Sequence, residues 1–217
     1  MRGCLGCAHE THKIVVCGLG GSGKTQMLYK LVLNQDVQTH PTVGFNLESL
    51  QHNSKTLEFW DIGGSYQANQ LHYYHCTKGI IFVVDSSENS DARIKFAREN
   101  LHAILGNHEL TELPLLVMAN KADICKLTND EIVEYLNLNS IQNTWHIVSV
   151  SAYEKDCNES YQHYSYQQNQ RIRITPKTQH NSQFRSQIIF TFFEQQMKFI
   201  TILLIKNDRR KQCEVSA

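Results

Sequence analysis

An octapeptide near the start of the chain, Gly18-Leu19-Gly20-Gly21-Ser22-Gly23-Lys24-Thr25, has the residue types and the spacing of a phosphate-binding loop. Glycines let the backbone turn so that successive N–H groups point at an anion. An apolar strand at residues 13–17 precedes the loop and a helical segment at residues 26–33 follows it. We expect Lys24 to reach the β- and γ-phosphates and the Thr25 hydroxyl to bind Mg²⁺. The alternative is a glycine-rich turn without a ligand, which this strand–loop–helix context disfavours.

A second candidate residue, Asp61, leaves an apolar strand expected at residues 57–60, and Gly64 follows three positions later. The Asp61 carboxylate is expected to hold Mg²⁺ through water, and the Gly64 N–H is expected to face the terminal phosphate. Alone, Asp-x-x-Gly is more often an ordinary turn. Its position about 40 residues after a phosphate loop favours a sensor of the γ-phosphate.

The tetrapeptide Asn120-Lys121-Ala122-Asp123 follows a buried strand expected at residues 114–119. An ionised Asp123 accepts hydrogen bonds from the ring N1–H and the exocyclic amine of guanine, a pair that adenine lacks. A site built on such bonds rejects the analogue without them by about 10⁴–10⁵. The stem of Lys121 would lie along the base. The Ala152 N–H, which comes directly after Ser151, would meet the guanine oxygen.

Strand and helix patterns alternate along the first two thirds of the chain, which predicts a doubly wound α/β fold with a mostly parallel sheet between two layers of helices. Candidate ligands follow the strands, as expected at the carboxyl edge of such a sheet. Further strands are expected at residues 47–50, 79–85 and 145–150, and helices at residues 91–105 and 128–136. The second helix opens with a capping box, Thr128 and Glu131.

Five motifs in order resemble the Arf and Arf-like small GTPases over residues 13–152. They are the phosphate loop, Pro-Thr-Val-Gly-Phe-Asn at residues 41–46, Trp-Asp-Ile-Gly-Gly at residues 60–64, Asn-Lys-Ala-Asp at residues 120–123 and Ser-Ala at residues 151–152. The resemblance implies that Thr42 binds Mg²⁺ and the γ-phosphate in the GTP state. It also implies that Phe45, Trp60 and Tyr73 form an apolar patch for effector proteins, although packing at a sheet edge explains the same trio.

The same resemblance implies a monomeric switch that binds GTP or GDP with Mg²⁺, in membrane trafficking or in ciliary or cytoskeletal signalling. Its partners would be effectors, an exchange factor and a GTPase-activating protein. GTP would order residues 41–46 and 61–78, and partners would sense the difference between the two states. The two strands between these segments would slide in register.

The chain departs from the family at Ser65, where most GTPases carry the glutamine that orients the attacking water. A serine hydroxyl is too short to contact both the water and the phosphate, so we expect slow or partner-dependent GTP hydrolysis. Residues 66–78 are also about two residues shorter than in the family. The runner-up is a pseudo-GTPase scaffold that holds GTP without useful hydrolysis. A kinase-like phosphate-loop enzyme is disfavoured by Asn120-Lys121-x-Asp123 and by the absence of an Arg-rich lid.

Composition and charge narrow the class of protein further. The formal net charge is zero, which argues against general binding of nucleic acid. Residues 1–152 carry 11 basic and 15 acidic residues, a balance of −4, whereas residues 153–217 carry 10 and 6, a balance of +4. Seven cysteines, an odd number, do not resemble a disulfide framework. With no secretory signal visible, we expect a cytoplasmic protein, peripheral on an internal membrane if the termini contact lipid.

The N-terminal residues 1–12 are expected to be flexible. Two thiols, Cys4 and Cys7, suit palmitoylation, and two lipid chains hold a membrane where one does not. Metal binding by these thiols with His9 and His12 is the weaker alternative. Arg2 excludes N-myristoylation.

The C-terminal 65 residues differ most from the family. Residues 153–187 are of low complexity and expected to be disordered, since ten of the thirty residues 158–187 are Gln or Asn. Residues 188–205 have an amphipathic pattern, which indicates a displaced last helix on the sheet or, with basic residues up to 211, a helix on a membrane surface. A spanning helix is disfavoured by two charges in eighteen residues. An error in the gene model is a further alternative. Residues 206–217 form a basic tail without a prenylation box.

Overall fold

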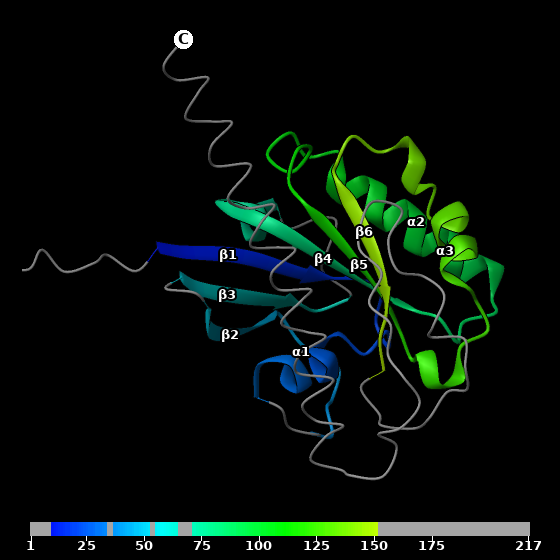
Figure 1. The fold of residues 1–217 in the computed structure, drawn as a ribbon, viewed down its shortest axis with the longest axis horizontal. Coiled ribbons are helices and arrows are strands. Elements are labelled where there is room, and N and C mark those ends of the chain that lie inside the picture. The colour runs from blue at the N-terminus through cyan, green and yellow to red at the C-terminus, as the bar shows by residue number, and fades with distance from the viewer. Residues whose placement is uncertain (1–9, 34–36, 53–54, 65–70, 152–217) are drawn as a thin grey trace, which may run out of the picture.

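The structure is a computed structural model that describes residues 10–33, 37–52, 55–64 and 71–151. Its centre is a six-stranded sheet in the order β2-β3-β1-β4-β5-β6 (Figure 1). Only the β2–β3 pair is antiparallel, and the other four pairings are parallel. The predicted doubly wound, mostly parallel α/β fold is therefore confirmed.

The elements follow the predicted alternation. The strands are β1 (Glu10–Cys17), β2 (Phe45–His52), β3 (Lys55–Ile62), β4 (Thr77–Asp85), β5 (Leu115–Asn120) and β6 (Trp145–Ser149). The helices are α1 (Lys24–Leu33), α2 (Asp91–Leu105) and α3 (Asn129–Tyr135). Short 3-10 turns are η1 (Leu71–Tyr74), η2 (Ala122–Ile124) and η3 (Leu138–Ser140).

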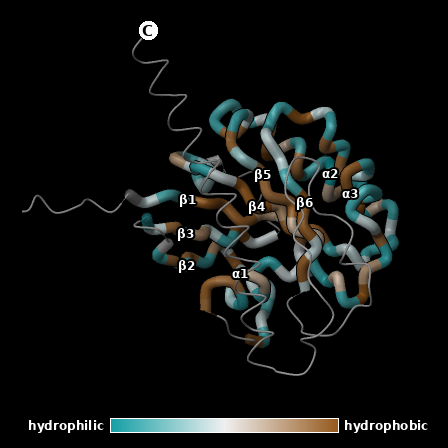
Figure 2. Tube along the Cα trace, in the orientation of Figure 1, coloured by the Kyte–Doolittle hydropathy of each residue, from teal (hydrophilic) through white to brown (hydrophobic). Residues whose placement is uncertain are grey.

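Helices of the described residues lie on both faces of the sheet, with α1 on one face and α2 and α3 on the other (Figure 1). Met27 and Leu28 of α1 pack with Ile14 of β1, whereas Leu101 of α2 packs with Val15. Successive residues of β1 thus serve opposite cores, because strand side chains alternate between faces. Apolar residues are accordingly continuous along the central strands, a pattern typical of a parallel sheet covered on both sides (Figure 2).

Several elements are longer than their apolar runs predict. The first strand begins at Glu10 rather than residue 13, because Glu10 and Thr11 pair with Lys55 and Thr56 of β3. Likewise β2 and β3 extend to a full eight-residue register, Phe45 opposite Ile62 through His52 opposite Lys55. Backbone hydrogen bonds along the ladder supply the stability of these polar ends.

The carboxyl ends of β1, β3, β4, β5 and β6 meet at one edge of the sheet because these strands run in parallel. The phosphate loop leaves β1 at this edge, and Asp61, Asp85 and Asn120 lie at the carboxyl ends of β3, β4 and β5, on either side of β1. The capping box of α3 is also present, with Glu131 N donating to Thr128 Oγ1 and Thr128 N donating to Glu131 Oε2. Sequence motifs that are far apart along the chain are thereby collected at one place.

Candidate functional site

The loop from Gly18 to Thr25 has a backbone that only glycine tolerates at its key positions. Gly18 and Gly23 have φ angles of 135° and 82°, in the region that residues with a Cβ avoid. A Cβ on Gly18 would meet the carbonyl oxygen of Val83, and one on Gly23 would meet the side-chain amide of Asn120. The loop therefore requires these glycines both for its turn and for its close fit against β4 and β5.

Lys24 opens α1 beneath this loop and is 6% exposed. Its ammonium group donates hydrogen bonds to the carbonyl oxygens of Gly18, at 2.8 Å, and Leu19, at 3.0 Å. Burial lowers the pKa of Lys24, while the charge of Asp61 opposes this shift. A buried cation held by neutral carbonyls at the start of a helix favours a bound anion.

Three oxygen-bearing side chains from separate segments converge beside Lys24. Thr25 Oγ1 lies 2.5 Å from Asp61 Oδ2 and 2.9 Å from Thr42 Oγ1. Asp61 is fully buried, and among the described residues its Oδ1 has no hydrogen-bond partner. Burial raises the pKa of Asp61, opposed by the Thr25 hydroxyl and the charge of Lys24. Two hydroxyls and a carboxylate with a spare oxygen suit a hard cation such as Mg²⁺, so the residues present fit this ion.

Gly63 and Gly64 bring the end of β3 against two other segments, residues 42–44 and the phosphate loop. Gly63 N donates to the carbonyl oxygen of Gly44 at 2.9 Å. A Cβ on Gly64 would meet the backbone nitrogen of Gly20. Residues 42–44, residues 63–64 and the phosphate loop thus meet at one point, where sequence analysis places the γ-phosphate. Ser65 lies outside the described residues.

The tetrapeptide at residues 120–123, which begins with the last residue of β5, is fixed by hydrogen bonds on both sides. Asn120 Nδ2 donates to the carbonyl oxygen of Ser22 at 2.8 Å, which joins this segment directly to the phosphate loop. Asp123 Oδ1 accepts from the Ser151 hydroxyl at 2.6 Å. Lys121 has φ of 61°, and its ammonium lies 2.5 Å from Asp85 Oδ2. Four of the predicted residues are therefore placed together, while Ala152 lies outside the described residues.

Sequence reasoning missed the loop between β4 and α2 as part of the site. Ser86 donates to the Asn120 carbonyl from its backbone N, at 2.8 Å, and from its hydroxyl, at 2.7 Å. Arg93 Nη2 donates to the carbonyl oxygen of Gly20 at 2.9 Å. The available signal was Asp85 at the carboxyl end of a buried strand, the position at which ligands bind in such sheets.

The aromatic residues Phe45, Trp60 and Tyr73 form one cluster beside these segments. The rings of Phe45 and Trp60 stack with centroids 4.8 Å apart, and Tyr73 lies 5.4 Å from Phe45. Lys13 places its ammonium 4.1 Å from the Trp60 centroid and donates to the carbonyl oxygen of His75 at 3.1 Å. Phe45 remains 41% exposed. The predicted trio is brought together, with a surface open to a partner.

Other candidates fall outside this edge of the sheet. Cys17 is buried, Cys76 and Cys125 are exposed, and these three thiols of the described residues are free. Burial raises the pKa of Cys17 to about 12, so it is an inert core thiol. The described residues contain no helix long and apolar enough to cross a membrane. Cys4, Cys7 and the predicted helix at residues 188–205 lie outside the described residues.

Comparisons with known proteins agree with this geometry. The model of the ADP-ribosylation factor family matches residues 3–167. ADP-ribosylation factor K of Dictyostelium discoideum is 40% identical over 148 residues, which cover 66% of this chain and 78% of that protein. Among solved structures, the Arl6 BBS3 small GTPase of Trypanosoma brucei with the bound nucleotide analogue GppNp matches with a TM-score of 0.58. It is 27% identical, and the match covers 65% of this chain and 87% of that one.

Proposed function

The chain belongs to the ADP-ribosylation factor family of small GTPases, and from this premise we propose that it is a Mg²⁺-dependent GTP/GDP switch with slow hydrolysis. The observation that carries the proposal is the meeting of Thr25, Thr42 and Asp61 beside the buried ammonium of Lys24. A switch needs such a site, because its two mobile segments must share one ion and one phosphate.

Each residue of the site has a distinct role in this proposal. The backbone N–H groups of Gly20, Gly21, Ser22 and Gly23 and the ammonium of Lys24 bind the phosphates. The hydroxyls of Thr25 and Thr42 would hold Mg²⁺, and Asp61 would hold it through water. The ion would neutralise charge on the phosphates. The Gly64 N–H would bind the γ-phosphate and so hold residues 63–64 beside the phosphate loop.

Guanine is selected at the other end of the site. Asp123 accepts from two N–H groups of the base, the Asn120 amide supports the loop, Lys121 covers the ring and the Ala152 N–H meets the guanine oxygen. The Ser151 hydroxyl, 2.6 Å from Asp123 Oδ1, orients that carboxylate. Such an oriented acceptor discriminates against adenine because adenine would leave it without a donor.

The first test is the nucleotide content of the purified full-length chain, measured by chromatography after denaturation. We expect about one guanine nucleotide per chain, since tight phosphate and base contacts retain it through purification. A fluorescent GDP analogue should bind the emptied protein, and the matched ATP analogue should not. An empty protein that ignores the GDP analogue at micromolar concentrations would refute the proposal.

Slow hydrolysis follows from Ser65, and the second candidate, a pseudo-GTPase scaffold, is favoured by the same residue. Single-turnover hydrolysis of bound GTP with and without cell extract separates the two. For a slow switch, Ser65→Gln should accelerate hydrolysis about 10-fold to 100-fold by positioning the water. GTP that stays intact for hours in extract, in both the wild type and this variant, would establish the scaffold instead.

The cellular part of the proposal concerns where this switch acts. We infer a cytoplasmic monomer that reaches internal membranes through palmitoylation of Cys4 and Cys7 or through a helix at residues 188–211. There it would serve trafficking or ciliary or cytoskeletal signalling through effectors on Phe45, Trp60 and Tyr73. In this domain plan residues 13–152 bind the nucleotide. Vesicle co-sedimentation of the palmitoylated full chain, compared with the double variant Cys4→Ser and Cys7→Ser, separates the two routes: loss of binding assigns it to the thiols, and retained binding assigns it to residues 188–211.

A further inference from the structure

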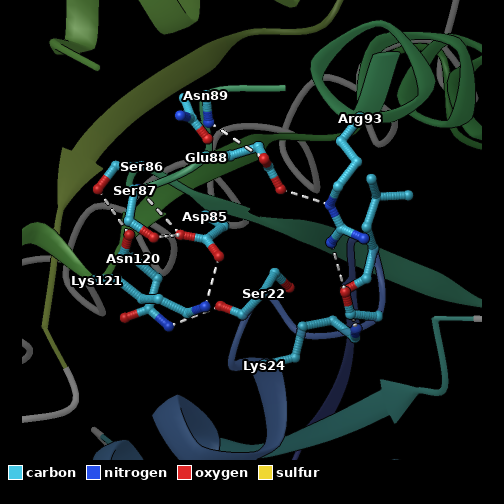
Figure 3. A network of polar contacts seen from close by, with 12 residues as sticks. Ser22, Lys24, Asp85, Ser86, Ser87, Glu88, Asn89, Arg93, Asn120 and Lys121 are labelled. Carbon is cyan, nitrogen blue, oxygen red and sulfur yellow. Dashed lines mark hydrogen bonds and ion pairs between the residues drawn. The ribbon is translucent and has the colours of Figure 1, made fainter. Parts of the chain in front are cut away.

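Residues 85–90, which are the last residue of β4 and the loop from β4 to α2, connect the two ends of the proposed nucleotide site. At the phosphate end, Arg93 Nη2 donates to the Gly20 carbonyl at 2.9 Å, and Arg93 Nε lies 2.5 Å from Glu88 Oε2. Figure 3 shows Arg93 extending from α2 to the phosphate loop, with Glu88 against its guanidinium. One side chain thus bridges the loop after β4 and the loop after β1.

Glu88 is itself held in place by the backbone around it. Its Oε1 accepts from the N–H groups of Asn89, at 3.1 Å, and Ser90, at 3.0 Å. Its own N–H donates to the Asp85 carbonyl at 3.3 Å. Because Oε1 is engaged in this way, Oε2 is presented to Arg93 from a fixed turn. The Glu88 side chain is 19% exposed, so the pair is partly shielded from water.

The same loop is tied to the guanine end of the site. Asp85 Oδ2 pairs with Lys121, and Asp85 Oδ1 accepts from Ser87 through both its N–H, at 3.0 Å, and its hydroxyl, at 2.6 Å. Asn120 then returns to the phosphate loop through the Ser22 carbonyl. The contacts therefore close a ring from Gly20 through Arg93, residues 85–90 and residues 120–121 back to Ser22 (Figure 3).

The contacts with β4 and β5 hold the phosphate loop at Gly18 and Gly23, whereas a Cβ built on Gly21, in the middle of the loop, would meet only Arg93 Nη2, at 4.0 Å. No heavy atom lies within 4 Å of a Cβ built on Gly20, and a cavity of about 30 Å³ lies between the loop and α2. Leu19, Ser22 and Arg93 are among the residues that line this cavity, which has room for a water molecule. Within the described residues the Ser22 hydroxyl has no partner. The consecutive glycines Gly20 and Gly21 have conformational freedom that must be lost when phosphates bind.

We propose that Arg93, oriented by Glu88, is a positioning residue that holds the phosphate loop in its binding conformation and thereby slows the release of GDP. This inference rests on the proposed binding of guanine nucleotide. The Glu88–Arg93 pair by itself contributes little, since Arg93 is half exposed. Its effect comes from the charge-assisted hydrogen bond to the Gly20 carbonyl, whose loss would free the loop.

The test measures the release of a fluorescent GDP analogue from the full chain in excess GDP. Arg93→Gln should accelerate release about threefold to tenfold, as expected for the loss of one charge-assisted hydrogen bond. The release rate of Arg93→Lys should lie between those of the wild type and Arg93→Gln, because a single ammonium cannot contact both Gly20 and Glu88 as the two sides of a guanidinium do. Glu88→Gln should accelerate release about twofold. Lys95→Gln is the matched control, because Lys95 lies on the same helix and pairs with Glu99 at 3.9 Å.

A second readout separates support of the phosphate loop from a general effect on the fold. GMP lacks the β-phosphate, which the proposed function places in the phosphate loop, so Arg93→Gln should weaken GDP binding more than GMP binding. The melting temperature of the nucleotide-free variant should match that of Lys95→Gln. Release at the wild-type rate, or an equal loss for GDP and GMP, would overturn the proposal. A wild-type chain that binds no guanine nucleotide would instead refute the proposed function.

Discussion

The guanine side and the switch side of the site are held by the fold in different ways. On the guanine side, all six residues of β5 are buried, and Asn120, Lys121 and Asp123 each have a side-chain hydrogen bond. On the switch side, β2 is an edge strand on which Phe45 and Leu47 are 41% and 47% exposed. The proposed selectivity for the base thus rests on residues that follow an interior strand, while the residues expected to change between states lie where fewer neighbours oppose movement.

The largest effect should come from the guanine side. Asp123→Asn exchanges an acceptor for a group that presents an N–H to the guanine amine, so GDP affinity should fall at least about 10³-fold. Xanthosine diphosphate has an oxygen in place of that amine. It should therefore bind the Asp123→Asn variant more tightly than it binds the wild type. Competition against a fluorescent GDP analogue measures both affinities.

The control for this substitution is Glu112→Gln, which removes an exposed carboxylate far from the base loop. If the Asp123→Asn variant kept its GDP affinity within tenfold of the wild type, Asp123 would not be the residue that selects guanine.

A smaller effect is expected at Asp61, which meets Thr25 at the proposed Mg²⁺ site. Asp61→Asn should weaken Mg²⁺-dependent GTP binding about 10-fold to 100-fold. It should also stabilise the nucleotide-free protein at neutral pH by about 1 kcal/mol, because a buried carboxylate is replaced by a neutral amide. Titration with Mg²⁺ and urea unfolding measure the two effects.

The pH dependence of unfolding isolates the Asp61 carboxyl. Its pKa is raised in the folded protein above the ordinary 3.8, so the folded state binds more protons than the unfolded state between these two values. The contribution of Asp61 to stability should therefore decrease as pH rises through that window and stay constant above it. Asp61→Asn should lack this decrease. A wild-type curve parallel to that of the variant would contradict the assigned cause.

A substitution on the switch side should lower the stability of the protein without lowering its affinity for GDP. Phe45→Ala removes the stacking on Trp60 and the contact with Tyr73, and should lower the free energy of unfolding by about 1–2 kcal/mol. GDP affinity should stay within about twofold, because the ring of Phe45 packs on Trp60 and Tyr73, which the proposal does not assign to the nucleotide. A tenfold loss of GDP affinity would mean that the two sides are not separable.

The smallest effect is expected at Lys13, which lies over Trp60 and donates to the His75 carbonyl. Lys13→Met keeps the length of the side chain but removes both contacts, at about 0.5–1 kcal/mol. Fluorescence of Trp60, measured with Trp145→Phe to remove the other tryptophan, should change in intensity. An unchanged spectrum would show that Lys13 does not support the aromatic cluster.

Much of this site follows from local sequence. Gly18 and Gly23 need φ angles that a Cβ resists, the Thr128–Glu131 capping box starts α3, and strand periodicity places Asp61 and Asn120 at strand ends. Each depends on interactions between residues a few positions apart, which is why spacing alone predicts it.

Tertiary structure alone decided the contacts that join these motifs. Arg93 meets Gly20 across 73 positions, and Lys121 meets Asp85 across 36, because strand order places β4 between β1 and β5. Sheet pairing likewise extended β1 back to Glu10 through residues whose polarity predicts a loop. The order and register of strands emerge from the burial of both faces of the sheet, a property of the whole chain that no single motif contains.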